Sequence, residues 1–261
     1  MAETWHYGLV ALWWSEFNLD GPEISYFKKA IQQSGVPALD VGCGTGRILI
    51  PCLEEGIDVH GTDISSEMID YCQAKIDSKN LKTKLYVSST HELDLDCEYK
   101  TIISCGVFGV GTTREEDLEG LKRLKKHLIS GGKFVFDFYL PGRGSNKWEW
   151  SEEHQPNLPS KWSKSDHRDL LDGTSLSLQT RILEFNPIDQ YYIREILVEQ
   201  HKDKMLVGRE QRQIRLNIYL KDEVEFMLQS VGFSEVKIFA GLSDRDPIPS
   251  KDYYLMVEAS L

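Results

Sequence analysis

Hydrophobic positions along this chain form short apolar runs, and these runs are separated by segments with helical spacing. The apolar runs predict five buried strands, at residues 38–41, 57–62, 84–87, 101–105 and 133–138. The helical faces between them are marked by Ile48, Leu49, Cys52 and Leu53, by Met68, Ile69, Cys72 and Ile76, and by Leu118, Leu121, Leu124 and Leu128, with a stop at Gly131 and Gly132. Strands and helices that alternate in this way predict a mostly parallel sheet with helices on both faces.

Segments near both ends of the chain extend this α/β pattern. Residues 1–35 mix aromatic and polar side chains, and they predict one or two amphipathic helices that end at Gly35. Helical spacing returns at 224–231, and two more strands are predicted at 236–239 and 254–257. The expected fold class is therefore α/β, with a Rossmann-like, seven-stranded, mostly parallel sheet.

The central part of the chain has a different hydrophobic period. From about residue 174 to residue 220, apolar and polar side chains alternate, and turn sequences at 186–189 and 202–204 divide the segment. This alternation predicts three antiparallel strands. The preceding stretch, 141–165, is rich in proline and glycine and predicts a loop; it also contains Trp148, Trp150 and Trp162.

Because helical and parallel-strand signals resume after the antiparallel strands, we interpret those strands as an insertion in one α/β domain. The expected parts are residues 1–140, the inserted loop and antiparallel β subdomain at 141–219, and residues 220–261, which complete the domain.

Composition and charge narrow the functional classes. The 261 residues are 41% hydrophobic and carry a formal net charge of −11 at pH 7. An acidic surface repels phosphates, so we expect neither nucleic acid nor a membrane as partner. Five cysteines without a CxxC pair argue against disulfides and zinc, and no metal is predicted. With neither a leader-like segment nor a long apolar run, the expected location is the cytoplasm.

The segment Asp40–Gly46 carries the clearest functional signal. It reads DVGCGTG and joins a predicted strand to a helix, so free amide groups at the helix start can receive an anionic group of a ligand. Its GxGxG spacing differs from the GxGxxG of nicotinamide-binding loops. Asp40 is suited to a positive group, such as an amine. Asp63 ends the next strand, where its carboxylate can accept both hydroxyls of a ribose.

These residues resemble the class I S-adenosylmethionine-dependent methyltransferases. The resemblance is strongest in LDVGCGTGR, residues 39–47; it covers 36–140 and returns over 220–261. It implies S-adenosyl-L-methionine as the cofactor, with the methionine amine near Asp40 and the ribose at Asp63. The residues that it assigns to the cofactor site are Trp14, Asp40, Gly42, Cys43, Gly44, Gly46, Arg47, Asp63, Ile64, Met68, Ser89, Thr90, Cys105 and Gly106.

Two positions depart from the family pattern. Ser89 stands where the family usually has an aspartate that contacts the adenine amine, and the Thr90 N–H could serve a ring nitrogen. Val110 stands where some sugar N-methyltransferases have a catalytic histidine, so no general base is assigned.

The function expected from these features is methyl transfer to a small-molecule acceptor, an amine or another intrinsic nucleophile, under a substrate cap formed by 141–219. The alternatives are a non-catalytic nucleoside-binding protein of the same fold and an NAD-dependent oxidoreductase. The acceptor and the oligomeric state are left open.

Overall fold

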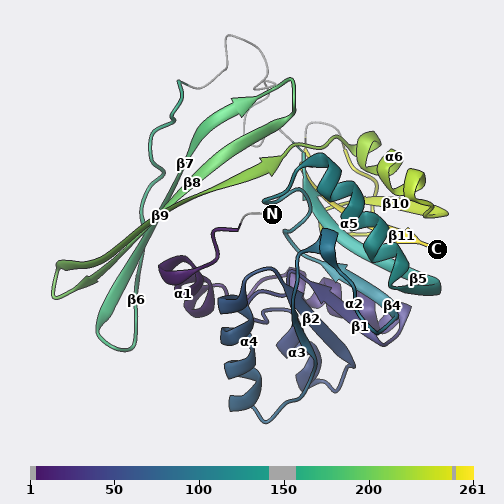
Figure 1. Cartoon of the computed structure of the whole chain (residues 1–261), viewed down its shortest axis with the longest axis horizontal. Coiled ribbons are helices and arrows are strands. Elements are labelled where there is room, and N and C mark those ends of the chain that lie inside the picture. The colour runs from purple at the N-terminus through teal and green to yellow at the C-terminus, as the bar shows by residue number, and fades with distance from the viewer. Residues whose placement is uncertain (1–3, 141–156, 249–250) are drawn as a thin grey trace.

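The computed structural model describes residues 4–140, 157–248 and 251–261, and it arranges them around two β-sheets (Figure 1). The larger sheet has seven strands in the order β10-β11-β5-β4-β1-β2-β3. Its strands are β1 (Ala38–Val41), β2 (Val59–Asp63), β3 (Leu85–Val87), β4 (Tyr99–Ser104), β5 (Leu128–Tyr139), β10 (Glu235–Ala240) and β11 (Tyr254–Ser260). Neighbouring strands pair in parallel except at β11, which is antiparallel to both β5 and β10. This arrangement confirms the predicted fold class.

Helices cover both faces of this sheet. The helical elements of the described residues are α1 (Gly8–Phe17), α2 (Glu23–Ser34), α3 (Leu49–Glu54), α4 (Ser66–Ser78), the short 3₁₀ turn η1 (Thr90–Glu92), α5 (Arg114–Lys126) and α6 (Lys221–Val231). Buried side chains of α2, α3 and α4 pack on one face, and those of α5 and α6 pack on the other. Ser65 caps α4 by accepting the Met68 N–H.

The smaller sheet, hereafter the cap sheet, is antiparallel and has the order β6-β7-β8-β9. Its strands are β6 (Asp166–Asp169), β7 (Thr174–Asn186), β8 (Tyr191–Lys202) and β9 (Met205–Asn217). The inserted antiparallel sheet and both predicted turns are confirmed, but the expected number of three strands was wrong. The fourth strand, β6, consists of exposed polar residues that pair with the edge of β7, so backbone bonding rather than an apolar pattern defines it.

The boundary between α5 and β5 also differs from the prediction. The helix ends at Lys126, and Leu128 begins the strand instead of continuing the helical face. Gly131 and Gly132 lie inside β5 at a register shift against β4, where Gly131 has a φ of +68°. The glycine pair therefore forms an irregularity within a strand and does not stop a helix. Trp148 and Trp150 lie outside the described residues, while Trp162 stacks on the Arg181 guanidinium.

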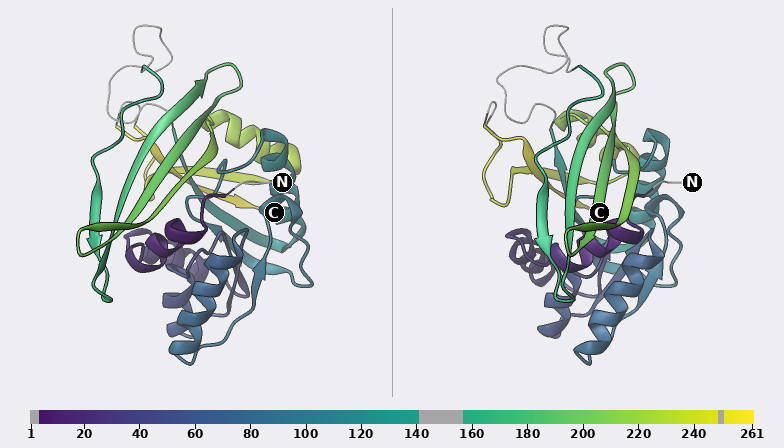
Figure 2. Two further views of the ribbon diagram at one scale, coloured as in Figure 1. Left: turned by 60° about the vertical axis from the view of Figure 1, so that its left-hand side comes forward. Right: turned by 90° about the vertical axis from the view of Figure 1, so that its left-hand side faces the viewer.

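The cap sheet stands beside the α/β domain, and α1 lies between them (Figures 1 and 2). One face of the cap sheet packs its apolar side chains, including Leu176, Ile196 and Ile214, against Trp5 and Trp13 of the N-terminal segment. In the part of the chain that is described, no helix is long and apolar enough to cross a membrane.

Strand order fixes where a ligand can enter this fold. From β1 the chain moves outward to β2 and β3, and then returns to the other side of β1 as β4. In open α/β sheets, the carboxyl ends of strands at such a reversal diverge and leave a crevice. The loops after β1 and β4 are therefore the expected floor of a binding site.

Candidate cofactor and substrate site

A large cavity of about 710 Å³ lies at this edge of the seven-stranded sheet. Its floor comes from the loops after β1, β2, β3 and β4, and its walls include residues of the N-terminal segment, α5, β5 and the cap sheet. Of the fourteen residues predicted for the cofactor site, thirteen line this cavity: Trp14, Asp40, Gly42, Cys43, Gly44, Arg47, Asp63, Ile64, Met68, Ser89, Thr90, Cys105 and Gly106. The fold thus brings together residues that are more than ninety positions apart in the sequence.

Three glycines shape the loop after β1. Gly42, Gly44 and Gly46 have φ values of +71°, +56° and +89°, which side chains rarely adopt. A Cβ on Gly42 would collide with the Val107 side chain. Gly46 is the one predicted residue that does not line the cavity. A side chain at this position would point into the protein interior, where its Cβ would lie 2.7 Å from Ile50. The loop is a close-fitting turn with its backbone toward the cavity.

Asp63 connects this loop to the end of β2. Its carboxylate accepts the Gly44 N–H and the Ser65 N–H, each at 2.9 Å, and the residue is 8% exposed. Burial raises the pKa of Asp63, and the backbone hydrogen bonds act in the opposite direction. The two donors orient the carboxylate beside the cavity, where its remaining lone pairs can accept two hydroxyl groups.

Asp40 is the more unusual of the two acids. It lies in β1 and is 2% exposed, yet no described residue donates a hydrogen bond to its side chain. Burial, together with the charge of Asp63, raises the pKa of Asp40 to about 7. A carboxylate that lines a cavity in this condition fits a ligand that brings its own cation.

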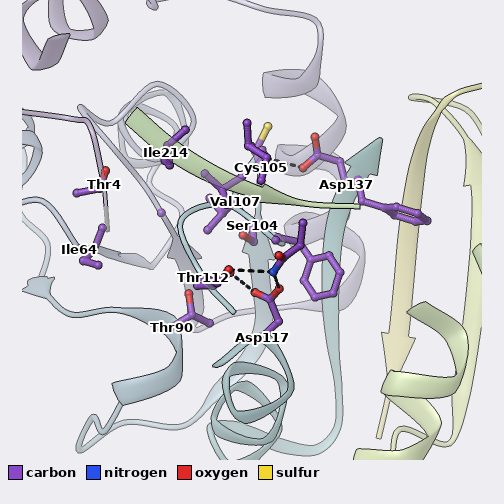
Figure 3. A pocket seen from close by; sticks show the side chains of 18 of the residues that line it. Thr4, Ile64, Thr90, Ser104, Cys105, Val107, Thr112, Asp117, Asp137 and Ile214 are labelled. Carbon is purple, nitrogen blue, oxygen red and sulfur yellow. Dashed lines mark hydrogen bonds between the residues drawn. The ribbon is translucent and has the colours of Figure 1, made fainter. Parts of the chain in front are cut away.

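A third buried acid, Asp137 of β5, was not predicted. Its Oδ1 accepts the Gly106 N–H at 2.6 Å, and burial raises its pKa to about 6. Figure 3 shows the Asp137 and Cys105 side chains next to each other at the cavity wall. Nearby, Arg47 forms an ion pair with Glu23 of α2 and approaches the Cys105 sulfur with its Nη2 at 3.6 Å. In the sequence, Asp137 reads as one polar residue within an apolar strand, which was the available signal.

The N-terminal segment covers the side of the cavity near α4. Trp5, His6 and Trp14 line it, with ring centroids of His6 and Trp14 5.0 Å apart. Burial lowers the pKa of His6 to about 4, so the ring is neutral at pH 7. Ser65 donates to the His6 carbonyl oxygen at 2.5 Å and thereby fastens this segment to the loop after β2. Only Trp14 of these three was predicted.

A buried polar network joins the cap sheet to the floor of the cavity (Figure 3). Asp117 of α5 accepts hydrogen bonds from Thr112 at 2.6 Å, from Asn217 at 2.8 Å and from Tyr219 at 2.6 Å. Burial raises the pKa of Asp117, and these donors oppose the rise. Because Asn217 ends β9, the network fixes how the cap sheet meets the domain. Tyr192 and Arg194 of β8 also line the cavity on the side of the cap sheet.

The hydrogen-bonding groups of this cavity suit a nucleoside that carries an amino-acid tail. It combines a glycine turn, an oriented carboxylate at Asp63 and an unpartnered buried carboxylate at Asp40. No group of three His, Cys, Asp or Glu side chains is placed to hold a metal ion within the described ranges.

The sequence comparison agrees with this geometry. Residues 38–132 match the methyltransferase domain family, and the arrangement of the two sheets is that of the class I methyltransferase fold. A relative from Geobacillus sp. (strain WCH70), provisionally named a methyltransferase, is 26% identical over 51% of this chain and 57% of its own length. YqeM of Bacillus subtilis (strain 168), named in the same way, is 29% identical over 39% of this chain and 41% of its own. The matches thus span about half the length of these relatives.

A third relative, the ubiquinone biosynthesis O-methyltransferase of Rickettsia bellii (strain OSU 85-389), is 23% identical over 73% of this chain and 77% of its own. Solved structures resemble the whole chain. An S-adenosylmethionine-dependent methyltransferase from Clostridium acetobutylicum ATCC 824 has a TM-score of 0.70 at 15% identity, and covers 96% of both chains.

Two further structures are named as N-methyl or amino-sugar enzymes. The sugar N-methyltransferase KedS8 from Streptoalloteichus sp ATCC 53650 has a TM-score of 0.69 at 14% identity, covering 98% of this chain and 97% of its own. The amino pentose methyltransferase CalS10 from Micromonospora echinaspora, solved with S-adenosylmethionine bound, has a TM-score of 0.66 at 14% identity over the full length of both chains. At these identities the likeness concerns the fold.

Proposed function

We propose that this chain is an S-adenosylmethionine-dependent methyltransferase whose acceptor is a small-molecule amine. The observation that carries the proposal is the pair of buried carboxylates that flank one glycine turn at the floor of the cavity. In this assignment Asp63 holds the ribose, Asp40 holds the methionine ammonium, and the backbone of Gly42–Gly44 lies against the tail. When bound, the cofactor supplies an electrophilic methyl group on a sulfonium.

The residues around the methionine tail and the sulfonium of the cofactor orient the two reactants and exclude water. Displacement at a sulfonium methyl needs an aligned nucleophile more than acid or metal assistance, and alignment contributes up to about 7–11 kcal/mol. Trp14 and the neutral His6 offer apolar and aromatic surface next to the floor of the cavity. The cap sheet, within the proposed substrate-cap segment 141–219, would close the cavity over the acceptor.

The charge of the cavity supports an amine. Its lining includes five acidic side chains, at Asp40, Asp63, Glu116, Asp117 and Asp137, but two cationic ones, at Arg47 and Arg194. Asp40 and Asp63 are assigned to the cofactor, and Asp117 accepts hydrogen bonds from three side chains. Glu116 accepts the Thr113 N–H in the capping box of α5. Asp137 is then the carboxylate suited to hold an acceptor ammonium, and its raised pKa makes it a better proton acceptor than an exposed aspartate.

Calorimetric titration with S-adenosylmethionine and S-adenosylhomocysteine tests the cofactor assignment, and we expect micromolar binding of both. Methyl transfer is then measured with methyl-labelled cofactor against a panel of small amines, phenols and thiols. We expect label to enter amines, because the carboxylate-rich wall favours cations over neutral hydroxyl compounds.

The outcomes separate the parts of the proposal. Folded protein that binds neither nucleoside would contradict the cofactor assignment. Transfer to phenols alone would retain the cofactor and remove the amine acceptor, and would agree with the O-methyltransferase relative. Tight binding without transfer to any class would favour a non-catalytic nucleoside-binding protein. An Asp63→Ala variant serves as the binding-deficient control.

A further inference from the structure

Ser89, which follows β3, makes a hydrogen bond that defines its role in the cavity. It lines the cavity, is 6% exposed, and lies 2.8 Å through its Oγ from Oε2 of Glu92. The Ser89 hydroxyl donates this hydrogen bond, and the carboxylate of Glu92, which is exposed at the surface, accepts it. The hydroxyl proton therefore points toward Glu92, which does not line the cavity.

The lone pairs of Ser89 have no other use in the described structure. Although Ser89 is the residue before η1, its side chain does not accept a backbone N–H of that turn, as serine at such a position commonly does. No other described group donates to its Oγ. A buried hydroxyl that already donates its proton, and whose lone pairs accept no hydrogen bond, can still accept one from a ligand.

The strand order shows which part of a nucleoside this acceptor would meet. The Ser88 N–H donates to the Asp63 backbone carbonyl oxygen at 2.9 Å, so the ends of β2 and β3 lie side by side, and both Asp63 and Ser89 line the cavity there. Moving outward along the sheet, the tail site at β1 is followed by the ribose site at β2 and then by β3. A base attached to a ribose at Asp63 can therefore extend toward Ser89.

We propose that Glu92 is a positioning residue that fixes Ser89 as a hydrogen-bond acceptor, so that this site selects a base with an amino group over one with a carbonyl at the same position. The inference rests on the proposed cofactor. An untethered serine hydroxyl rotates, and can donate to a carbonyl as readily as it accepts from an amine. With its proton held by Glu92, Ser89 can bind the 6-amino group of adenine but opposes the 6-oxo group of hypoxanthine with its lone pairs.

The test compares S-adenosylhomocysteine with S-inosyl-L-homocysteine, which differs at this edge of the base, by calorimetric titration. The wild-type protein should prefer the adenosyl compound by about five- to 150-fold, the range that corresponds to one buried unpaired polar group. Glu92→Ala should bind the adenosyl compound within about threefold of wild type. Its preference should fall at least fivefold, because the inosyl compound gains a donor.

Two further variants make the result specific. Ser89→Ala should weaken adenosyl binding about two- to tenfold, since the acceptor is lost. Asp94→Ala is the matched control, because Asp94 is an exposed acid two residues beyond Glu92 that pairs with Lys126 and does not line the cavity. It should keep the wild-type preference, which excludes a general effect of charge. Thermal melting of each variant verifies that it is folded.

An unchanged preference in folded Glu92→Ala would overturn the positioning role, and unchanged adenosyl affinity in Ser89→Ala would overturn the acceptor role. A wild-type protein that binds both compounds equally would overturn base selection while leaving the cofactor site intact. Absence of any binding would instead remove the proposed function, and with it this inference.

Discussion

Replacing Asp40 by asparagine should change how the stability of the protein depends on pH. The folded protein raises the pKa of Asp40 from its ordinary value of 3.8 to about 7, chiefly through burial. As pH rises through this window, the carboxyl group of the unfolded chain ionises first. The unfolded state is therefore favoured progressively, and the loss is complete above about pH 7.

The magnitude follows from the two pKa values. Each pKa unit between the folded and unfolded states corresponds to about 1.4 kcal/mol, so an ionised Asp40 costs the apo protein about 4 kcal/mol at pH 8. Part of this cost is already present at pH 5, where the unfolded carboxyl group is largely ionised. Between pH 5 and pH 8 the difference in unfolding free energy between Asp40→Asn and wild type should thus move by about 3 kcal/mol in favour of the variant.

Urea denaturation followed by tryptophan fluorescence at pH 5, 6, 7 and 8 measures this difference. Asp137 and the other titrating groups are present in both proteins and largely cancel. A bound cofactor ammonium would favour the ionised Asp40, so S-adenosylhomocysteine should bind more tightly at pH 8 than at pH 6 and release protons on binding at pH 6. Unfolding free energies of the two proteins that run parallel from pH 5 to pH 8 would refute the argument.

Three other substitutions test separate parts of the site. Asp63→Ala should weaken S-adenosylhomocysteine binding about ten- to 100-fold, because hydrogen bonds to a charged group contribute about 1.5–3 kcal/mol; calorimetry measures it, and unchanged affinity would contradict the ribose assignment. Trp14→Ala should weaken S-adenosylmethionine more than S-adenosylhomocysteine, by an extra two- to 30-fold, because about 0.5–2 kcal/mol of cation–π attraction acts on the sulfonium; equal losses would exclude it. Tyr219→Phe should lower the unfolding free energy by about 1.5–3 kcal/mol, because it removes the 2.6 Å hydrogen bond to buried Asp117. Urea denaturation measures this free energy, and a value equal to that of the wild type would contradict the role of the hydrogen bond.

The residues at the floor of the cavity could be predicted because their signals are local. Asp40, Gly44 and Asp63 lie within one strand–loop–helix–strand unit, and parallel strands bring their carboxyl ends to one edge whatever the rest of the chain does. Thirteen of fourteen predicted residues accordingly line the cavity, although their roles remain predictions. Gly46 shows the limit of the pattern: the sequence cannot tell whether a required glycine faces the ligand or, as here, Ile50.

The walls of the cavity could not be predicted, because they depend on contacts between distant segments. His6 reaches the site through the bond from Ser65, a separation of 59 residues, and Asn217 reaches Asp117 across 100 residues. Neither pairing leaves a periodic trace in the sequence. Asp137 is hidden for a different reason: a fully buried strand tolerates one acid only where the fold supplies donors, and those donors come from Gly106 and Tyr254.

These buried acids connect the stability of the fold with its proposed chemistry. Asp40, Asp63, Asp117 and Asp137 are all nearly inaccessible and all have raised pKa values, so each disfavours the apo protein when ionised. Asp117 accepts hydrogen bonds from Thr112, Asn217 and Tyr219, whereas no described residue donates to the side chain of Asp40. Stability alone would replace Asp40 by an apolar residue, as β1 is otherwise buried and apolar. A cationic ligand in the cavity would explain why the carboxylate of Asp40 is retained. By neutralising this carboxylate, such a ligand would stabilise the protein by more than its contacts with the uncharged cavity walls alone predict.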